Sequence, residues 1–410
     1  MQRVLLLMAT RTYRAKAFMT AAHALGGEVI VGSERRQALS HLARGTSLTL
    51  DFRRPENAVK RIADFARKMP LDAVVGVDDG TTLVAAMASQ ALSLTGNSPE
   101  SIEAAQNKFQ VRELLAMAGL LSPTFWLLPA GGDPATLAAQ VIYPCVLKPV
   151  FLAASQGVIR ANDPREFIAA FERIRAILSR PEVRERGGDW AEKILVESFI
   201  PGTEVALEGL LSDGELRVLA IFDKPDQLDG PYFEETIYLT PSRLPRDDQS
   251  AIAGTVAQTA AALGLREGPI HAELRLNERG AWIIEIAARS IGGRCSSVLE
   301  FGAGVSLEDL ILRQAIGAEL PEIPDSLRPS GAMMIPIPRR GILRAVKGRE
   351  QAAAVPGIAG IDITVPVGHE VAPLPEGDRY LGFIFAHGST LDATESALRE
   401  AHRRLEFVIA

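Results

Sequence analysis

The sequence has few cysteines, no long apolar run and no excess of positive charge. Its two cysteines, Cys145 and Cys295, are far apart among 410 residues, so we expect neither a disulfide framework nor a thiolate metal site. No stretch approaches the roughly 18 apolar residues of a transmembrane helix. The net charge of −6 disfavours nucleic acid and anionic membranes as bulk partners. These features predict a cytoplasmic protein in a reducing compartment.

Two common phosphate-binding motifs are missing as well. "MATRTYR" follows the first apolar run where a GxGxxG motif would stand, which disfavours a dehydrogenase. GxxxxGK[ST] occurs nowhere, which excludes a Walker-type loop. The run "VLLLMA" is too short for the apolar core of a signal peptide and directly follows Arg3, so it predicts a buried parallel strand.

The first 95 residues alternate strands and helices. Apolar runs at "RVLLLMA", "EVIVG" and "DAVVGV" are separated by helical apolar stripes within 17–25 and 59–66. This βαβ pattern predicts a parallel sheet flanked by helices. The turn "VDDGTT" (77–82) lies at the carboxyl end of that sheet, where ligands tend to bind. Asp79 in this turn either contacts a ligand or caps a helix.

The rest of the chain, too long to share one core with this sheet, predicts further domains. The segment "NKFQVRELLAMAGL" predicts a helix, and the loop "AASQG" (153–157) connects two predicted strands. The polar, Gly-rich segment 179–191 predicts a mobile connection. A Pro-rich stretch at 319–331 precedes a β-rich tail that ends in a helix over 391–405.

Residues 271–293 predict a hairpin with two carboxylates on one face. A three-residue loop over 278–280 would pair Asn277 with Ala281 and place Glu273 opposite Glu285. Like charges at such a pair destabilise a sheet, so a cation should lie between them. A divalent metal fits carboxylate ligands. The alternative is a solvated face with a nearby arginine as partner.

Several other polar residues, each considered alone, have both a functional and a structural interpretation. Lys148 ends an apolar strand and either binds a ligand or extends to solvent. Glu197 and Glu204 flank "SFIPGT" and are either ligands or solvated side chains. His271 is either functional or a structural histidine.

The order of these features resembles the ATP-grasp superfamily over roughly residues 1–320. "LVESFIPGTEVALEG" and the pair "HAELRL" and "IIEIAAR" are its most specific parts. The tail, with "PIPRRGILRAV" and "YLGFIFAHG", is similar to the C-terminal domain of bacterial L-amino-acid (dipeptide) ligases. The resemblance implies an α/β fold with four parts. These are an N-terminal parallel-sheet domain (1–105), small (106–190) and large (191–325) ATP-grasp subdomains, and a β-rich C-terminal domain (326–410).

The resemblance also implies roles for individual residues. The lysines Lys108 and Lys148 would hold ATP phosphates, and backbone amides of Ser155, Gln156 and Gly157 would cap them. The strand Glu197, Ser198, Phe199 and Ile200 would contact adenine, and Glu204 the ribose. Two Mg²⁺ ions, with Mn²⁺ able to substitute, would bind Glu273 and Glu285. The catalytic candidates are Arg289, His271 and Lys224.

One position departs from the superfamily pattern. Many members have Asn two residues after the second metal glutamate, but this chain has Ala287 there. Water or substrate would then complete the metal shell. The glycines of "RSIGGR" (289–294) would bind an oxyanion or a substrate carboxylate, and the loops 149–157 and 225–240 would act as lids.

The expected reaction is ATP-dependent joining of a carboxylate to an amine through an acyl phosphate, with amino acids as substrates. Carboxylation or formylation is the rival reaction, although no "AMKM" biotinylation motif is present. A catalytically inactive nucleotide sensor is the rival from another class. The sequence leaves open the substrate pair and whether the protein is a homodimer.

Overall fold

A computed structural model describes the chain except for residues 1, 11, 36–46, 302–303 and 324–326. Its N-terminal part is a parallel sheet with strand order β3-β2-β1-β4. The strands are apolar throughout because both faces are covered. Val4 and Leu6 pack on α1, whereas Leu5 and Leu7 pack on α2 and α3. The elements are β1 (Arg3–Leu7), α1 (Ala15–Ala24), β2 (Glu28–Ser33), β3 (Ser47–Thr49), α2 (Pro55–Ala66), β4 (Ala73–Gly76) and α3 (Asp79–Ala91).

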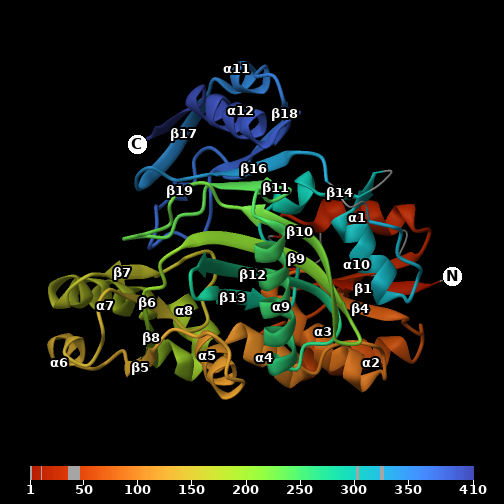
Figure 1. Cartoon of the computed structure of the whole chain (residues 1–410). Coiled ribbons are helices and arrows are strands. Elements are labelled where there is room, and N and C mark those ends of the chain that lie inside the picture. The colour runs from red at the N-terminus through yellow and green to blue at the C-terminus, as the bar shows by residue number, and fades with distance from the viewer. Residues whose placement is uncertain (1, 11, 36–46, 302–303, 324–326) are drawn as a thin grey trace.

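Two helices then lead into a small antiparallel sheet of order β5-β8-β6-β7 (Figure 1). One face of this sheet is covered by α7, whose apolar stripe includes Phe167, Phe171 and Ile174. The elements are α4 (Pro99–Gln106), α5 (Lys108–Met117), β5 (Phe125–Pro129), α6 (Pro134–Ala138), β6 (Cys145–Pro149), β7 (Ile159–Ala161), α7 (Pro164–Leu178) and β8 (Lys193–Ser198). We call residues 108–198 the small lobe.

The segment 179–191, predicted to be a mobile connection, contains two short helices. These are α8 (Pro181–Gly187) and the 3₁₀ helix η2 (Gly188–Glu192). Pro181 starts α8, where a missing N–H costs nothing, and Val183 and Gly187 are buried. The polar composition did not reveal these helices, because the exposed face of a short helix is as polar as a loop.

The centre of the molecule is an eight-stranded antiparallel sheet of order β13-β12-β9-β10-β11-β16-β20-β18. Helix α9 covers the end of this sheet that carries the predicted hairpin. An Asp-Gly turn at 213–214 joins β9 to β10. The elements are β9 (Thr203–Ser212), β10 (Glu215–Asp223), β11 (Ile237–Thr240), α9 (Arg246–Leu263), β12 (Gly268–Asn277), β13 (Gly280–Ala287), η3 (Cys295–Val298), β14 (Glu300–Phe301), β15 (Val305–Ser306) and α10 (Leu307–Ala315).

Strands of the β-rich tail continue this sheet rather than forming one of their own. β16 pairs with β11, and β20 and β18 follow. The predicted boundary at 325/326 falls on residues outside the described ones, so the four-part division stays a prediction. The tail comprises β16 (Ser330–Ile335), β17 (Gly341–Lys347), α11 (Arg349–Ala353), β18 (Ile358–Ile363), β19 (Glu370–Val371), β20 (Gly382–His387), α12 (Leu391–Arg403) and β21 (Glu406–Ile409).

The hairpin of β12 and β13 places Glu273 opposite Glu285, as predicted, but by a different route. Its loop has two residues, so Asn277 pairs with Gly280 and not with Ala281. A bulge at Ile284 supplies the missing offset, because Leu274 pairs with Ile283 and Glu273 with Glu285. The two errors cancel at the carboxylates. They do not cancel at Ile283, which is buried in the core although the prediction put it on the carboxylate face.

Both cysteines are buried and free. Among the helices that the structure describes, none combines the length and apolar character needed to cross a bilayer.

Candidate active site

Two adjoining cavities lie where the small lobe faces the hairpin. The inner cavity is narrow, about 70 Å³, and the outer chamber measures about 490 Å³. Lys108, Leu152, Ile284 and Glu285 line both, so the two spaces meet at these residues. The other predicted site residues that line the inner cavity are Lys148, Ser155, Glu197, Ser198, Phe199, Ile200, Glu204 and Glu273.

Lys148 and Glu197 form a buried ion pair on neighbouring strands. Lys148 on β6 donates to Glu197 on β8 at 2.7 Å. Arg112 on α5 donates to the same carboxylate at 2.7 Å and to the carbonyl of Ile284 at 2.7 Å. Burial alone would raise the pKa of Glu197, but the two cations outweigh it and lower the pKa to about 2. Glu197 is therefore a counter-ion of two cations in this structure.

Burial dominates at Lys148 itself and lowers its pKa despite the contact with Glu197. Lys148 is only 5% exposed, and Arg112 and Lys108 repel its ammonium. An incoming anion would stabilise this ammonium, which suits a phosphate better than a further cation.

Lys108 is the first residue of α5, as its sequence position suggested. Asn107 caps this helix by accepting from the amides of Phe109 and Gln110. The Lys108 ammonium donates to the carbonyl of Leu152 at 2.7 Å and lies 3.5 Å from Glu285. It thus joins Leu152, the residue just before the "AASQG" loop, to the hairpin.

The three residues of the 153–157 loop that were predicted to cap the phosphates do not all face the inner cavity. Ser155 lines the inner cavity. Gly157 donates its amide to the carbonyl of Pro375, and the Gln156 side chain donates to the carbonyl of Glu376. These two residues are thus bonded to the C-terminal region.

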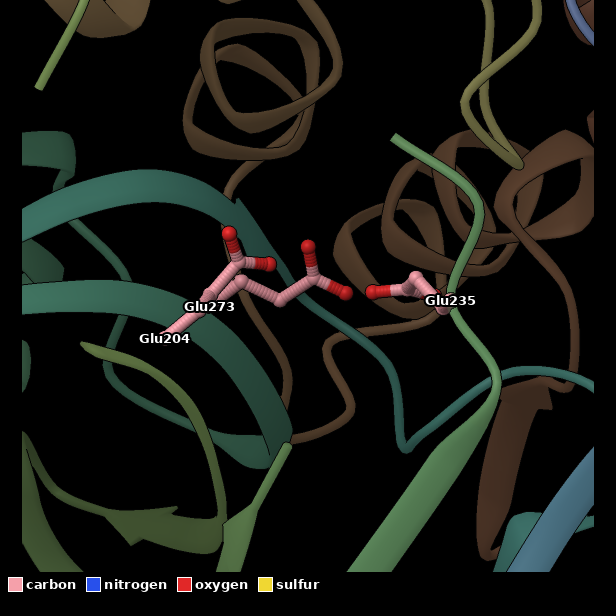
Figure 2. Close-up of side chains that lie close together, drawn as sticks. All are labelled: Glu204, Glu235 and Glu273. Carbon is pink, nitrogen blue, oxygen red and sulfur yellow. The ribbon is translucent and has the colours of Figure 1, made fainter. Parts of the chain in front are cut away.

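Lys224, which directly follows β10, is surrounded by three carboxylates, and Figure 2 shows the three glutamates that supply them. Its ammonium lies 2.9 Å from Glu204 and 3.4 Å from Glu273, and it also donates to Glu235. The three glutamates come from β9, β12 and the segment before β11, and one oxygen of each lies within 4.8 Å of the others. Such an oxygen set suits a divalent cation, and in this structure the Lys224 ammonium neutralises it.

These charges shift one another's titration strongly. The three carboxylates raise the pKa of Lys224 well above its usual range although burial opposes them. Burial and the nearby Glu273 raise the pKa of Glu235 to about 7. Burial opposes ionisation of Glu273 as well, but Lys224 and His271 hold its pKa well below its usual range. Of Glu235 and Glu273, Glu235 is therefore the carboxylate that more readily takes up a proton.

His271 bridges two glutamates behind the cavity. Its Nδ1 lies 3.1 Å from Glu208 and its Nε2 lies 3.5 Å from Glu273. Burial would lower its pKa, but the two carboxylates raise it to about 9. Glu208 also accepts the backbone N–H of Ile291 at 3.0 Å, so it connects His271 to the "RSIGGR" segment.

Arg289 is held by a carboxylate of the N-terminal part. Its Nε and Nη2 donate to the two oxygens of Asp79 at 2.8 and 3.0 Å. Asp79 is the first residue of α3, and the helix is capped by Asp78 instead. Asp79 therefore acts as an ion-pair partner, not as the cap, and it lines the outer chamber.

Sequence reasoning brought together most of this constellation but missed several members. Arg112 could have been found, because it lies one helical turn after Lys108. Glu235 could not have been predicted, because nothing in "YFEET" distinguishes it from its neighbour Glu234. Glu208 alternates with apolar residues on a strand and resembled an ordinary polar position.

Comparison with known proteins gives three matches to family models. The ATP-grasp domain matches residues 141–298, the ATP-grasp N-terminal domain residues 19–96, and the L-amino acid ligase C-terminal domain 2 residues 333–410. Together these models cover the tail and most residues that line the two cavities, but not residues 97–140, which include Lys108 and Arg112.

The chain is also similar in sequence to individual proteins. The chain is 25% identical to the uncharacterized protein y4rH of Sinorhizobium fredii (strain NBRC 101917 / NGR234) over 78% of this chain and 64% of that protein. It is 26% identical to alanine–anticapsin ligase of Bacillus subtilis (strain 168) over 68% of this chain and 61% of that protein. Both matches span less than two thirds of the relative's own length.

A solved structure resembles the whole chain. The crystal structure of L-amino acid ligase from Bacillus licheniformis superposes with a TM-score of 0.85 at 26% identity, covering 100% of this chain and 99% of that one.

Proposed function

We propose, since the chain belongs to the ATP-grasp superfamily and carries an L-amino acid ligase C-terminal domain, that it is an ATP-dependent carboxylate–amine ligase. It would join amino acids through an acyl phosphate and release ADP and phosphate. The comparisons support the class of reaction, and the arrangement of the two cavities supports its chemistry.

The observation that carries this proposal is the junction of the two cavities at Lys108 and Glu285. A nucleotide in the inner cavity would direct its terminal phosphate toward this junction. An organic substrate in the outer chamber would reach the same point from the other side. Phosphoryl transfer asks an enzyme mainly to hold its reactants in line and to neutralise charge. Lys108 at this junction and Lys148 in the inner cavity would do both.

The inner cavity offers separate surfaces for each part of ATP. Lys108, Lys148 and the Ser155 side of the loop would face the phosphates. The end of β8 and the two residues after it, from Glu197 to Ile200, would border the base, so the adenine segment expected as one strand is only half strand. The Glu197 carboxylate would act through Arg112 and Lys148 rather than on adenine directly. Glu204 would accept the ribose hydroxyls, as expected from the resemblance.

The carboxylates fit Mg²⁺. Glu273 and Glu285 lie opposite each other on the hairpin, and Glu204 and Glu235 bring further oxygen donors close to Glu273. Bound Mg²⁺ would neutralise the β- and γ-phosphate oxygens. Lys224 would then move from the centre of the carboxylates toward the phosphates, where its charge remains useful.

Arg289 would serve the second half of the reaction. The substrate carboxylate oxygen bonds to the γ-phosphorus as the bond to ADP breaks. An amine nitrogen then attacks the acyl carbon, and the phosphate leaves with the former carboxylate oxygen as the amine proton is lost. Arg289, fixed by Asp79, would stabilise the negative oxygen of the tetrahedral intermediate.

Product analysis tests the proposal. Incubation with ATP, Mg²⁺ and pairs of amino acids should yield ADP, phosphate and an amide in equal amounts. With one amino acid and hydroxylamine, a hydroxamate should accumulate because the acyl phosphate is trapped. AMP and pyrophosphate as main products would contradict the mechanism. Phosphate release that needs only bicarbonate or formate would favour carboxylation or formylation instead.

A glutamate substitution tests the metal assignment in the same assay. Glu285→Gln should abolish turnover, because it removes a charge from the carboxylate pair while keeping the shape of the side chain. Glu278→Gln, at the exposed tip of the same hairpin, is the matched control and should retain wild-type turnover. A Glu285→Gln protein with more than about a tenth of wild-type activity at saturating Mg²⁺ would exclude the metal role.

A further inference from the structure

The loop between β19 and β20 of the C-terminal region reaches down to the small lobe (Figure 1). Its residues Pro375 and Glu376 contact the 153–157 loop and helix α7, which are more than 190 residues away in the sequence. Neither contact was expected, because no role at the nucleotide cavity had been assigned to the C-terminal region.

Glu376 is bound by an arginine of α7 through both carboxylate oxygens. Arg173 Nη2 donates to Glu376 Oε2 at 2.8 Å, and its Nε donates to Oε1. A two-bond arginine–carboxylate pair fixes orientation as well as distance. The hydrogen bond from Arg173 lowers the pKa of Glu376, so this carboxylate is ionised at neutral pH.

The backbone at the same place binds the 153–157 loop directly. Gly157 donates its amide to the Pro375 carbonyl at 2.9 Å. The Gln156 side chain and Arg180 both donate to the Glu376 carbonyl, at 3.0 and 3.2 Å. The Glu376–Arg173 pair therefore positions the carbonyls that hold the loop.

The 153–157 loop needs such external support. Ala154, Ser155 and Gly157 all have positive φ, at 55°, 54° and 73°. For the two residues other than glycine this conformation is strained, and it persists only where surrounding contacts impose it. Ser155, which lines the inner cavity, lies in the middle of this strained stretch.

Arg173 also holds the second predicted lid. It donates to the Tyr232 hydroxyl, and its guanidinium lies 5.1 Å from the centre of the Tyr232 ring. Tyr232 belongs to the 225–240 loop, which places Phe233 and Glu235 in the inner cavity. Both lids thus line the cavity on their inner side and meet Arg173 and Glu376 on their outer side.

We propose that Glu376 of the C-terminal region is a positioning residue for ATP, which acts through Arg173 to hold both lids in the shape that binds the phosphates. Glu376 does not line the cavity itself. This inference rests on the proposed nucleotide role of the inner cavity. It assigns to the C-terminal region a direct part in ATP affinity.

The first test measures ATP kinetics in two single variants and their combination. Glu376→Ala and Arg173→Ala should each raise the KM for ATP about five- to tenfold, because the lids then spend less time in the binding shape. The kcat should stay within about twofold of wild type, since neither residue touches the reacting atoms. The double variant should be no worse than either single one, because both remove the same contact.

Two further variants make this test specific. Glu376→Asp retains the charge and should recover part of the affinity. Glu400→Ala is the matched control, because Glu400 lies in the same region but pairs with Arg403 and Arg404 on its own helix. Its KM for ATP should be unchanged. An unchanged KM for ATP in Glu376→Ala would overturn the inference. A lowered KM would also overturn it, because it would show that the Glu376–Arg173 contact inhibits ATP binding.

The second test needs no nucleotide and so separates this inference from the proposed function. Hydrogen–deuterium exchange of the free protein should be several-fold faster at residues 153–158 in Glu376→Ala than in wild type or Glu400→Ala. Equal exchange would overturn the positioning role even if the enzyme is a ligase. Absence of ATP turnover in the wild-type protein would instead contradict the proposed function, and the exchange result would still decide whether Glu376 holds the loop.

Discussion

At the scale of single residues, buried charges are the feature that most distinguishes this site from an ordinary surface. Glu197 is 3% exposed and is held by Arg112 and Lys148. Removing one member of a buried ion pair leaves the others without compensation, which typically costs more than the pair contributes when intact. Glu197 is thus a stability determinant as well as a site residue.

The pH dependence of stability tests this interpretation. The folded pKa of Glu197 is lowered from 4.5 to about 2, so its contribution is complete above pH 4.5 and is lost as the pH falls through 2. Glu197→Gln should lower the free energy of unfolding by about 3 kcal/mol at pH 7. Urea denaturation should show the difference from wild type shrinking between pH 4.5 and the acid limit.

A control lies nearby on η2. Glu192 is exposed and lies 3.9 Å from Arg184, so Glu192→Gln should leave the unfolding free energy nearly unchanged at each pH. If the difference in unfolding free energy between Glu197→Gln and wild type stays constant with pH, the loss of stability comes from the shape of the side chain and not from its charge.

Arg289 provides a second prediction at this scale. Its two parallel bonds to Asp79 require the planar guanidinium, which lysine lacks. Arg289→Lys should therefore reduce kcat by about 100-fold, in the range seen when an oxyanion donor is removed, with little change in the KM for ATP. Arg279→Lys, on the exposed hairpin turn, should have no effect. Steady-state kinetics with wild-type kcat in Arg289→Lys would exclude its role in the second step.

At the scale of secondary-structure elements, short and irregular pieces shape the cavities. Helix α8 and the segment after β6 meet at Gly187 and Phe151, and the Phe151 ring lines the outer chamber. A Cβ at position 187 would overlap the Phe151 ring. The glycine is needed here for close approach, since its backbone conformation is an ordinary helical one.

This contact predicts a compensating pair of substitutions. Gly187→Ala should displace the Phe151 ring into the chamber, lower the melting temperature by a few degrees and raise the KM for the amino-acid substrates. Phe151→Ala in the same chain should restore most of the melting temperature, because the added methyl group then has room. Equal melting temperatures in Gly187→Ala and wild type would mean that α8 shifts freely.

At the scale of the whole molecule, the C-terminal region is built into the centre of the protein. Met334, Phe383 and Phe385 belong to the same apolar core as Val4 and Phe18 of the N-terminal part. Three of its strands extend the central sheet beyond β11. The region thus supports the fold as well as the 153–157 loop.

Truncation tests this dependence. A chain that ends at residue 329 would expose the edge of β11 and the core that Met334 and Phe383 cover. It should lack a cooperative unfolding transition and should aggregate, as judged by circular dichroism and light scattering. Supplying residues 330–410 as a separate chain should restore solubility. A truncated protein that unfolds cooperatively would show that the tail is an independent domain.

The sequence by itself determined the elements that depend on local pattern. Apolar runs and helical stripes predicted the N-terminal parallel sheet, and the order of the motifs indicated the superfamily. Alternation along 271–287 placed Glu273 opposite Glu285, because the side-chain period of a strand is a property of the local backbone. The lysines 108 and 148 were found for the same reason, since each stands at a definable point of one element.

Tertiary structure decided everything that depends on which elements meet. The partner of Arg289 comes from a turn 210 residues earlier, and the partner of Arg173 comes from a loop 203 residues later. Lys224 is surrounded by carboxylates from three separate segments, of which Glu235 has no local signature. The bulge at Ile284 offsets the two-residue loop, so a count from the loop along a regular hairpin missed it. Ion pairs and register shifts of this kind arise from contacts between distant segments, and a local pattern of residues carries no information about them.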